Sequence, residues 1–254
     1  MADHLTSYRL AWTKGARIAA LILLALGAFR ATAAEIQTPD GKPPMVHWAI
    51  LESTPGDMDQ MQAFARENVA PRAPKEQGTY ALYGGVDATD PNRLCLLEIY
   101  RDESAYEIHV GSDEFHEYKS RRAPILKSLI IVPVEPIALE QKPEKGTEVW
   151  MRTVVVDKDD APAFRALARQ EALEATRKFD GVIGYFATED AESGKFMTLE
   201  VFRDSEARAN YRASSTYIEF RRKRDLIERG ADERKLNVGV ITLTEKYRED
   251  DGKN

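Results

Sequence analysis

The sequence predicts an α+β protein built from two tandem units of order β-α-β-β-α-β, whose sheets pack face to face within one chain. The first observation is an internal repeat: "LEIYRDESAYEIHVGSDEFHEYK" at 97–119 returns as "LEVFRDSEARANYRASSTYIEFR" at 199–221. The second is that strand-like and helix-like segments follow the same order in both copies. The third is "QKPEKG" at 141–146, a polar joint broken by Pro and Gly that is typical of a linker.

The repeat spans about a hundred residues, roughly 45–140 and 147–246. Its matching residues are 102 or 103 positions apart: Trp48 and Trp150, Gly78 and Gly181, Glu98 and Glu200. One small insertion and one compensating deletion explain the two spacings. A repeat of this length indicates that a complete folding unit was duplicated, so we expect one domain from each copy.

Each unit begins with a strand and a helix. "MVHWAILES" at 45–53 is apolar with β-branched and aromatic members, which favours a strand. Thr54, followed by Pro55, is the expected N-cap of the next helix. Its apolar residues recur at helical spacing: Met58, Met61, Ala65 and Val69. In the second copy Asp160 precedes Pro162 in the same way.

The rest of each unit supplies two strands, a helical stretch and a last strand. Gly78 ends a connection, after which "TYALYGGV" and "RLCLLEIYR" read as strands on either side of the turn-rich "DATDPN". Asp102 is expected to cap the following helix, which Gly111 or Ser112 interrupts. "SLIIVPVEPIAL" is the last strand, and its two prolines predict an edge or irregular strand.

This order of elements is the ferredoxin-like arrangement, an antiparallel sheet with helices on one face. A single unit leaves the other face of its sheet bare. Two copies can bury those faces against each other, as isologous dimers do. We therefore predict an intrachain pseudo-dimeric α/β barrel.

The N-terminus, residues 1–34, resembles a secretory signal peptide. Basic residues precede an apolar run at 18–29, and the small residues Ala31 and Ala33 follow. The run has 12 residues, whereas a membrane span needs roughly 20. We expect cleavage after Ala33 or Ala34 and a periplasmic or secreted protein, with a retained anchor as the alternative. At the other end, residues 247–254 form a polar tail.

The charge balance argues against nucleic acid as a partner. Without residues 1–33 the chain has 32 basic and 41 acidic residues, a net charge of about −9. Phosphate contacts need a positive face. The basic "RRKR" at 221–224 is flanked by acids, so we interpret it as a solvated helix face. The single cysteine, Cys95, allows no internal disulfide and is expected to be a small buried residue.

The repeated segment resembles a known family. "LLEIYRD" followed by "SAYEIHVGSDEFHEY" is similar to the motif of the antibiotic biosynthesis monooxygenase family. That motif has a Glu on the third strand, an aromatic residue, a helix with Ala-x-x-x-His, then Ser and Phe. "KEQGTYALY" at 75–83 resembles the family's Glu-Pro-Gly before a strand with Tyr, although Gln77 replaces the Pro. The likeness covers both units.

The resemblance implies a cofactor-independent monooxygenase that acts on a small quinol or phenol with dioxygen. Such chemistry requires a base to deprotonate the substrate, polar groups to hold the anion, and apolar walls. His109 occupies the family's histidine position, so the resemblance makes it the catalytic base. The expected substrate-binding residues are Trp48, Tyr83, Glu98, Tyr100 and Phe115. The resemblance implies that no cofactor is bound, and no metal is expected because no Cys/His cluster has metal-ligand spacing.

Structural explanations compete with these roles. Residues present in both copies, Trp48 among them, are more economically explained by the core. His109 precedes Gly111 and could hydrogen-bond a helix end, and His116 reads as a surface residue. Glu98 and Tyr100 share one face of their strand by period-two alternation, and that face lines either a pocket or the barrel seam.

The second copy lacks histidine, since Tyr211 stands at the His109 position. A tyrosine with a reference pKa of about 10 is a poor base at neutral pH. We therefore expect at most one active site per chain, with the second half as a scaffold or a changed pocket. Two alternatives stay open: a non-catalytic ligand-binding or scaffold protein of the same fold, and a haem-binding or haem-degrading member. Haem-degrading members carry an Asn on the first strand, which "MVHWAILES" lacks. Further pairing of chains also stays open.

Overall fold

The computed structural model describes residues 38–142 and 145–238. The signal peptide expected at 1–34 and the polar tail at 247–254 lie outside these residues, so both stay predictions. Within the described ranges, no helix has the length and apolar character needed to cross a membrane.

Both halves follow the order predicted from the sequence. The first contains β1 (Met45–Ser53), α2 (Met58–Asn68), β2 (Thr79–Asp87), β3 (Arg93–Tyr100), α3 (Glu103–Val110), α4 (Asp113–Arg122) and β4 (Leu126–Gln141). The second contains β5 (Glu148–Val156), α5 (Ala161–Lys178), β6 (Val182–Asp190), β7 (Lys195–Phe202), α6 (Ser205–Ala213), α7 (Ser215–Arg224) and β8 (Glu228–Asn237). A single 3-10 turn precedes β2 (Ala73–Lys75) and another precedes α5 (Lys158–Asp160).

The break in the second helical stretch occurs where the sequence predicts it. The Asp102 carboxylate accepts from the Ala105 amide at 2.9 Å and caps α3. Ser112 then accepts from the Phe115 amide at 3.2 Å and caps α4. Asp204 and Ser214 repeat both caps in the second half, so the break belongs to the duplicated unit.

The start of the first helix differs from the prediction. Thr54 is not its N-cap, because α2 begins three residues after Pro55, at Met58. Residues 54–57 instead form a turn in which the Asp57 amide donates to the Thr54 carbonyl at 3.1 Å. Gly56 has φ +91°, the conformation that the third residue of a type II turn requires after Pro. The Pro-Gly pair therefore indicated a turn rather than a helix start.

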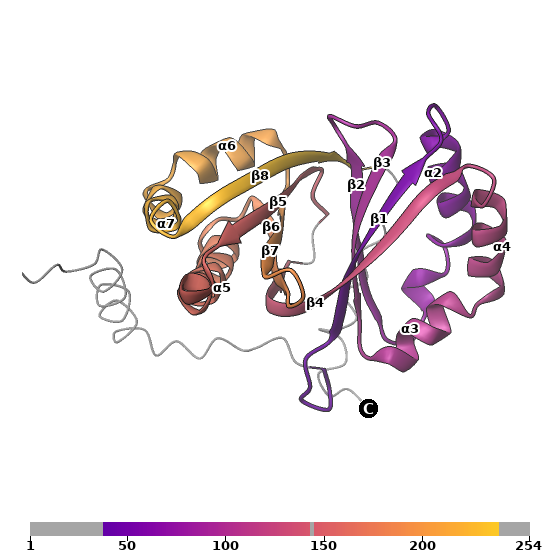
Figure 1. Ribbon diagram of the computed structural model, residues 1–254, viewed down its shortest axis with the longest axis horizontal. Helices are drawn as coiled ribbons and strands as arrows, with labels where there is room; N and C mark the ends of the chain where they lie inside the picture. The colour runs from indigo at the N-terminus through magenta and orange to yellow at the C-terminus, as the bar shows by residue number, and fades with distance from the viewer. Residues whose placement is uncertain (1–37, 143–144, 239–254) are drawn as a thin grey trace, which may run out of the picture. The chain divides into compact units, whose positions relative to one another are not determined.

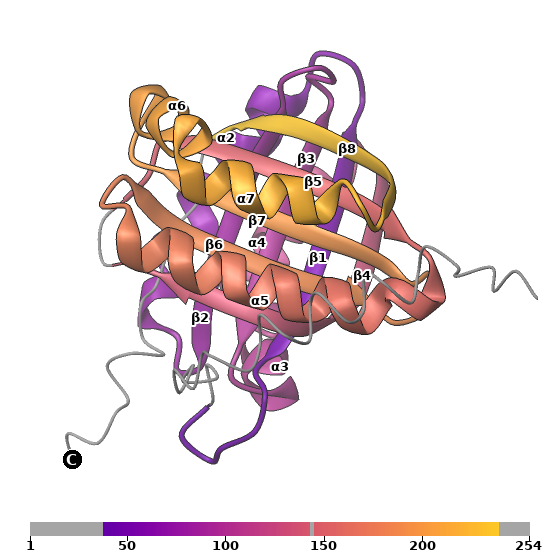
Figure 2. The ribbon, with the colours of Figure 1, turned by 90° about the vertical axis from the view of Figure 1, so that its left-hand side faces the viewer.

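Within the described residues, the eight strands form a closed antiparallel barrel in the order β1-β3-β2-β8-β5-β7-β6-β4. β4 pairs first with β1 and then with β6, and its register shifts between Pro136 and Ala138. β8 pairs with β5 and, at its end, with β2. The last strand of each half thus crosses to the other half. Figures 1 and 2 show α2–α4 outside one sheet and α5–α7 outside the other.

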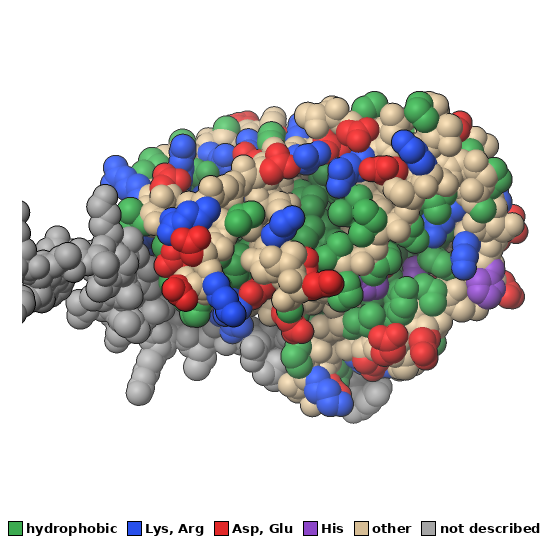
Figure 3. All heavy atoms as spheres, viewed as in Figure 1, with side chains coloured by type: hydrophobic (Ala, Val, Ile, Leu, Met, Phe, Trp, Pro, Cys, Tyr) green, Lys and Arg blue, Asp and Glu red, His purple; other side chains and the backbone are tan. Residues whose placement is uncertain are grey.

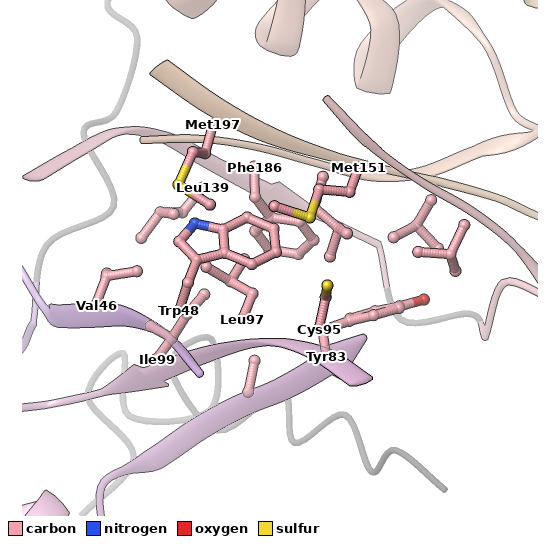
Figure 4. Close-up of a cluster of buried hydrophobic side chains, with 14 of the residues drawn as sticks. Val46, Trp48, Tyr83, Cys95, Leu97, Ile99, Leu139, Met151, Phe186 and Met197 are labelled. Atoms are coloured by element: carbon pink, nitrogen blue, oxygen red, sulfur yellow. The ribbon is translucent and has the colours of Figure 1, made fainter. Parts of the chain in front are cut away.

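The interior of the barrel is the main core. Side chains from both sheets meet there, including Trp48, Cys95, Met151, Phe186 and Met197, as Figure 4 shows. The Trp48 indole N–H donates to the Thr188 hydroxyl at 3.2 Å, across the two halves. Burial raises the pKa of the Cys95 thiol, in keeping with the small buried residue expected from the sequence. The two bare sheet faces do bury each other.

The strand register corrects the match between the two tryptophans. His47 lies opposite Glu98 in the β1–β3 pair, and Trp150 lies opposite Glu200 in the β5–β7 pair. The structural counterpart of Trp150 is therefore His47, at a spacing of 103, and Trp48 corresponds to Met151. A shift of one residue moves a side chain to the other face of a strand, so Trp48 faces the barrel interior whereas Trp150 faces the helices.

Gly78 lies where α3 packs closely against the segment that precedes β2. It has φ +87°, and a Cβ there would lie 2.7 Å from the Ala105 Cβ of α3. We expect Gly78→Ala to lower the free energy of unfolding by about 2–4 kcal/mol, since backbone strain and a clash add. Gly56→Ala is the matched control, because it has a similar φ of +91° but nothing within 4 Å of its Cβ. Urea unfolding of both variants measures the difference, and equal losses would contradict the clash.

Candidate active site

A cavity of about 340 Å³ lies between the sheet of the first half and its helices. Its walls are mainly apolar. They come from the strands (Ala49, Leu51, Leu82, Leu94, Leu96, Leu129, Ile131), from α2 and its end (Ala65, Val69, Ala70) and from α3 and α4 (Tyr106, Val110, Phe115, Tyr118). Its polar lining is Gln62, Glu98, His109, Lys119 and Arg122. Figure 3 shows purple histidine atoms among green hydrophobic side chains on this half. The cavity therefore suits a small, largely apolar molecule.

His109 lines this cavity from the last turn of α3, and a carboxylate holds its ring. Its Nδ1 lies 2.7 Å from Oε2 of Glu76. Glu76 follows the 3-10 turn before β2 and is buried. The same carboxylate accepts from the Thr79 hydroxyl at 2.8 Å and from Nε of Arg72 at 3.1 Å. Burial alone would raise the pKa of Glu76, but His109, Thr79 and Arg72 together hold it below its ordinary value.

The ionised Glu76 fixes the tautomer of His109. A carboxylate can only accept hydrogen bonds, so Nδ1 of the imidazole carries the proton. In the neutral ring Nε2 is then the atom with a free lone pair. His109 is part of the cavity wall and Glu76 is not. This arrangement of a base and an orienting carboxylate is the one that general-base catalysis uses.

A second histidine–carboxylate pair lies on the same face of the sheet. Nε2 of His47 contacts Oε2 of Glu98, and the Tyr100 hydroxyl donates to that oxygen at 3.1 Å. Burial, followed by the charge of Glu98, raises the pKa of Tyr100, so the phenol stays protonated and donates. The Tyr100 ring lies 5.6 Å from the His109 ring, which brings the two pairs together. The two histidine–carboxylate pairs and the Tyr100 phenol therefore form one cluster of groups that can donate and accept protons.

The structure brings together most of the residues predicted from the sequence. His109, Glu98 and Phe115 line the cavity, and Tyr100 lies behind Glu98. Glu98 and Tyr100 do share one face, and that face is turned toward the helices rather than the barrel interior. His116 is exposed, in agreement with its interpretation as a surface residue.

Trp48 and Tyr83 lie elsewhere. Both are buried in the barrel interior, where the Tyr83 ring packs 5.9 Å from the Phe186 ring. The reason is the alternation of side chains along a strand. Ala49 and Leu82, their neighbours in sequence, point to the cavity instead.

Two important residues of the site, His47 and Glu76, were missed from the sequence. The signal for His47 was its place on the first strand, one residue before Trp48, which puts the two on opposite faces. Glu76 stands in "KEQG", two residues before the glycine that precedes β2, and nothing in the sequence pairs it with a residue 33 positions away. Within the described residues, no group of three or more His, Cys, Asp or Glu is placed to hold a metal.

The same place in the second half holds a buried ion pair. Tyr211, at the position of His109, donates from its hydroxyl to Oε1 of Glu171 at 3.2 Å. Arg224 contacts the other oxygen of Glu171 and lies 3.6 Å from Glu228, Nε to Oε1. The basic run at 221–224 is thus only partly the solvated face predicted from the sequence, because Arg224 is buried.

The equivalent glutamates of the two halves, Glu98 and Glu200, have different surroundings. Glu98 has His47 and Tyr100 as partners, whereas the equivalent neighbours of Glu200 are Trp150 and Phe202. One oxygen of Glu200 is buried without a hydrogen-bond partner in the described structure. Burial, followed by the charge of Glu171, raises the pKa of Glu200 to about 7. The second half therefore has the equivalent glutamate but lacks the histidine and the tyrosine that bond to it in the first half.

Comparison with solved structures identifies the fold. A protein from Lactobacillus acidophilus NCFM, described as a candidate monooxygenase, superposes with a TM-score of 0.74 at 17% identity, covering 80% of this chain and 96% of its own. Another candidate monooxygenase, from Fusobacterium nucleatum, gives a TM-score of 0.72 at 16% identity, covering 79% and 94%. No curated protein matches the chain. At these identities the structural likeness concerns the fold.

The sequence itself matches the model of one family in both halves. The matched residues are 49–121 and 149–223, more than half of the chain, and the family is described as antibiotic biosynthesis monooxygenase. The two matches coincide with the two structural repeats, and the first contains His109 and Glu98. The chain therefore belongs to the antibiotic biosynthesis monooxygenase family, with two copies of its domain in tandem.

Proposed function

We propose that the protein is a monooxygenase that oxidises a small phenol or quinol with dioxygen, without a bound cofactor, and that His109 is its base. The observation that carries the proposal is the Glu76–His109 pair in the wall of an apolar cavity of about 340 Å³. Membership of the family supports the reaction class. The second half has no histidine at the corresponding position, so one site acts per chain.

The proposed reaction needs only a base, a dry pocket and dioxygen. His109 takes the hydroxyl proton, and the electron-rich phenolate passes one electron to dioxygen. Superoxide and the ring radical combine at a ring carbon, and the protonated His109 returns its proton to the peroxide. Loss of the proton on that carbon with cleavage of the O–O bond then gives a quinone and water. One phenol and one dioxygen thus yield one quinone and one water.

The test is dioxygen consumption by the full chain with a panel of phenols and hydroquinones. We expect His109→Gln to lower kcat/KM by about 10²–10⁴, the usual contribution of a general base. His116→Gln is the matched control, because His116 is exposed on the next helix and should leave the rate unchanged. Equal rates for wild type and the His109 variant, or no consumption above buffer, would refute the proposal.

A further inference from the structure

Arg122 is a buried cation that the proposed chemistry does not use. It is the last residue of α4, it lines the cavity, and it is 6% exposed. One of its terminal nitrogens donates to the Tyr118 hydroxyl at a long 3.4 Å, and its guanidinium lies 4.7 Å from the Tyr118 ring centre. Its Nε has no hydrogen-bond partner in the described part of the chain. A buried charge without a counter-ion is unfavourable unless a ligand supplies one.

The second half shows what such an arginine binds. Arg224 stands at the position of Arg122, 102 residues later, at the end of the matching helix. It pairs with the carboxylate of Glu171, whose other oxygen accepts from Tyr211. Tyr211 in turn stands at the position of His109. A carboxylate therefore lies between the counterparts of Arg122 and His109.

Both acids beside Arg224 are absent from the first half. At the 103-residue spacing of α2 and α5, Glu171 corresponds to Asn68, whose amide donates to its own helix at the Phe64 carbonyl. Glu228, the first residue of β8, corresponds to Leu126, the first residue of β4. Among the described residues that line the cavity, Glu98 is the one carboxylate, and it is engaged by His47 and Tyr100. The first half thus keeps the arginine and replaces both acids with neutral residues.

We infer that the cavity of the first half binds a small aromatic acid, whose carboxylate pairs with Arg122 and whose ring lies along the apolar walls beside His109. The bound carboxylate occupies the place that Glu171 fills in the second half. An arginine suits this role because its planar fork matches a carboxylate. As a statement about the substrate class the inference rests on the proposed function, whereas as a statement about binding it stands alone.

The experiment is calorimetric titration of the full chain with 2-naphthoate and its neutral isostere 2-naphthamide, and with benzoate and benzamide as the smaller pair. We expect wild type to bind at least one acid about tenfold or more tightly than its amide, and Arg122→Gln to lose that preference. Arg121→Gln, which removes a more exposed neighbouring charge, should keep it. Lys119, the other cation at the cavity, gives the competing variant Lys119→Gln.

Three outcomes overturn the inference. They are no preference for either acid in wild type, retention of the preference in the Arg122 variant, and its loss in the Lys119 variant instead. The comparison of acid and amide in wild type does not depend on the folding of any variant. If Arg122→Gln does not fold, Arg122→Lys keeps the charge and tests whether the planar guanidinium is required. Because binding is measured without turnover, a protein that prefers the acids but consumes no dioxygen would refute the proposed function alone.

A further variant introduces into the first half the acid that pairs with the arginine of the second half. Asn68→Glu introduces the acid that Glu171 supplies to Arg224. We expect its carboxylate to pair with Arg122 and to weaken binding of the aromatic acid by about tenfold or more, with little effect on the amide. Unchanged binding of the acid would contradict the equivalence of the two halves at this site.

Discussion

Replacing Arg224 with methionine is expected to destabilise the protein by about 3–5 kcal/mol, because it leaves the buried carboxylate of Glu171 without its counter-ion. Tyr211 is the other hydrogen-bond partner of Glu171 and cannot neutralise it. The guanidinium also lies 5.3 Å from the centre of the Tyr217 ring, so the substitution removes packing as well. Urea unfolding followed by circular dichroism measures the loss.

The double variant Glu171→Gln/Arg224→Met distinguishes two contributions to the loss of stability. One is the cost of leaving the Glu171 carboxylate buried without a counter-ion, and the other is the net contribution of the ion pair itself. The introduced glutamine would be uncharged and would still offer an oxygen to the Tyr211 hydroxyl. Replacing both members of a buried ion pair is often close to neutral, so we expect the double variant to recover most of the stability. Arg229→Met is the surface control, since its exposed ion pairs should be worth about 1 kcal/mol or less. A loss at Arg224 no larger than at Arg229 would show that the buried pair contributes nothing special.

The architecture was predictable because the repeat and the turn residues are local signals. The duplicated "RD" pair marks the cap of the second helical stretch, and the polar joint predicted a boundary between the halves, although β4 extends to Gln141. The need of each sheet to cover its bare face then leads to the barrel. The repeat alone did not reveal where the second copy is one residue shorter than the first. The spacing is 103 through β2 and 102 from β3 onward, so the deletion lies in the hairpin between them.

The candidate site was predictable only where it follows a family motif or strand alternation. His109 and Glu98 fall in the repeated segment, and alternation correctly placed Glu98 with Tyr100. Matching the tryptophans by identity shifted the alignment of β1 by one residue and hid the equivalence of His47 with Trp150, although the core role that the repeat favoured for Trp48 is correct. Glu76 could not be assigned, because its partner is chosen by how α3 lies against the loop before β2 rather than by any local pattern.

Glu76→Gln is expected to lower kcat by about a hundredfold or more while KM changes little, because Glu76 orients the base without lining the cavity. Arg72 can only donate, and its Nε points at one carboxylate oxygen. A glutamine would keep its carbonyl toward Arg72 and turn its NH₂ group toward Nδ1 of His109. The imidazole proton would then move to Nε2, the atom that should take the proton of the substrate.

The matched control for this prediction is Glu114→Gln. Glu114 pairs with a terminal nitrogen of Arg72 at 2.9 Å and is about half exposed. We expect its rate to equal that of wild type, so that any effect at Glu76 is not a general loss of charge near Arg72. Steady-state dioxygen consumption with the best phenol of the panel gives kcat and KM for both variants. If Glu76→Gln raised KM and left kcat unchanged, Glu76 would be part of the binding surface, and the assignment of His109 as an oriented base would be wrong.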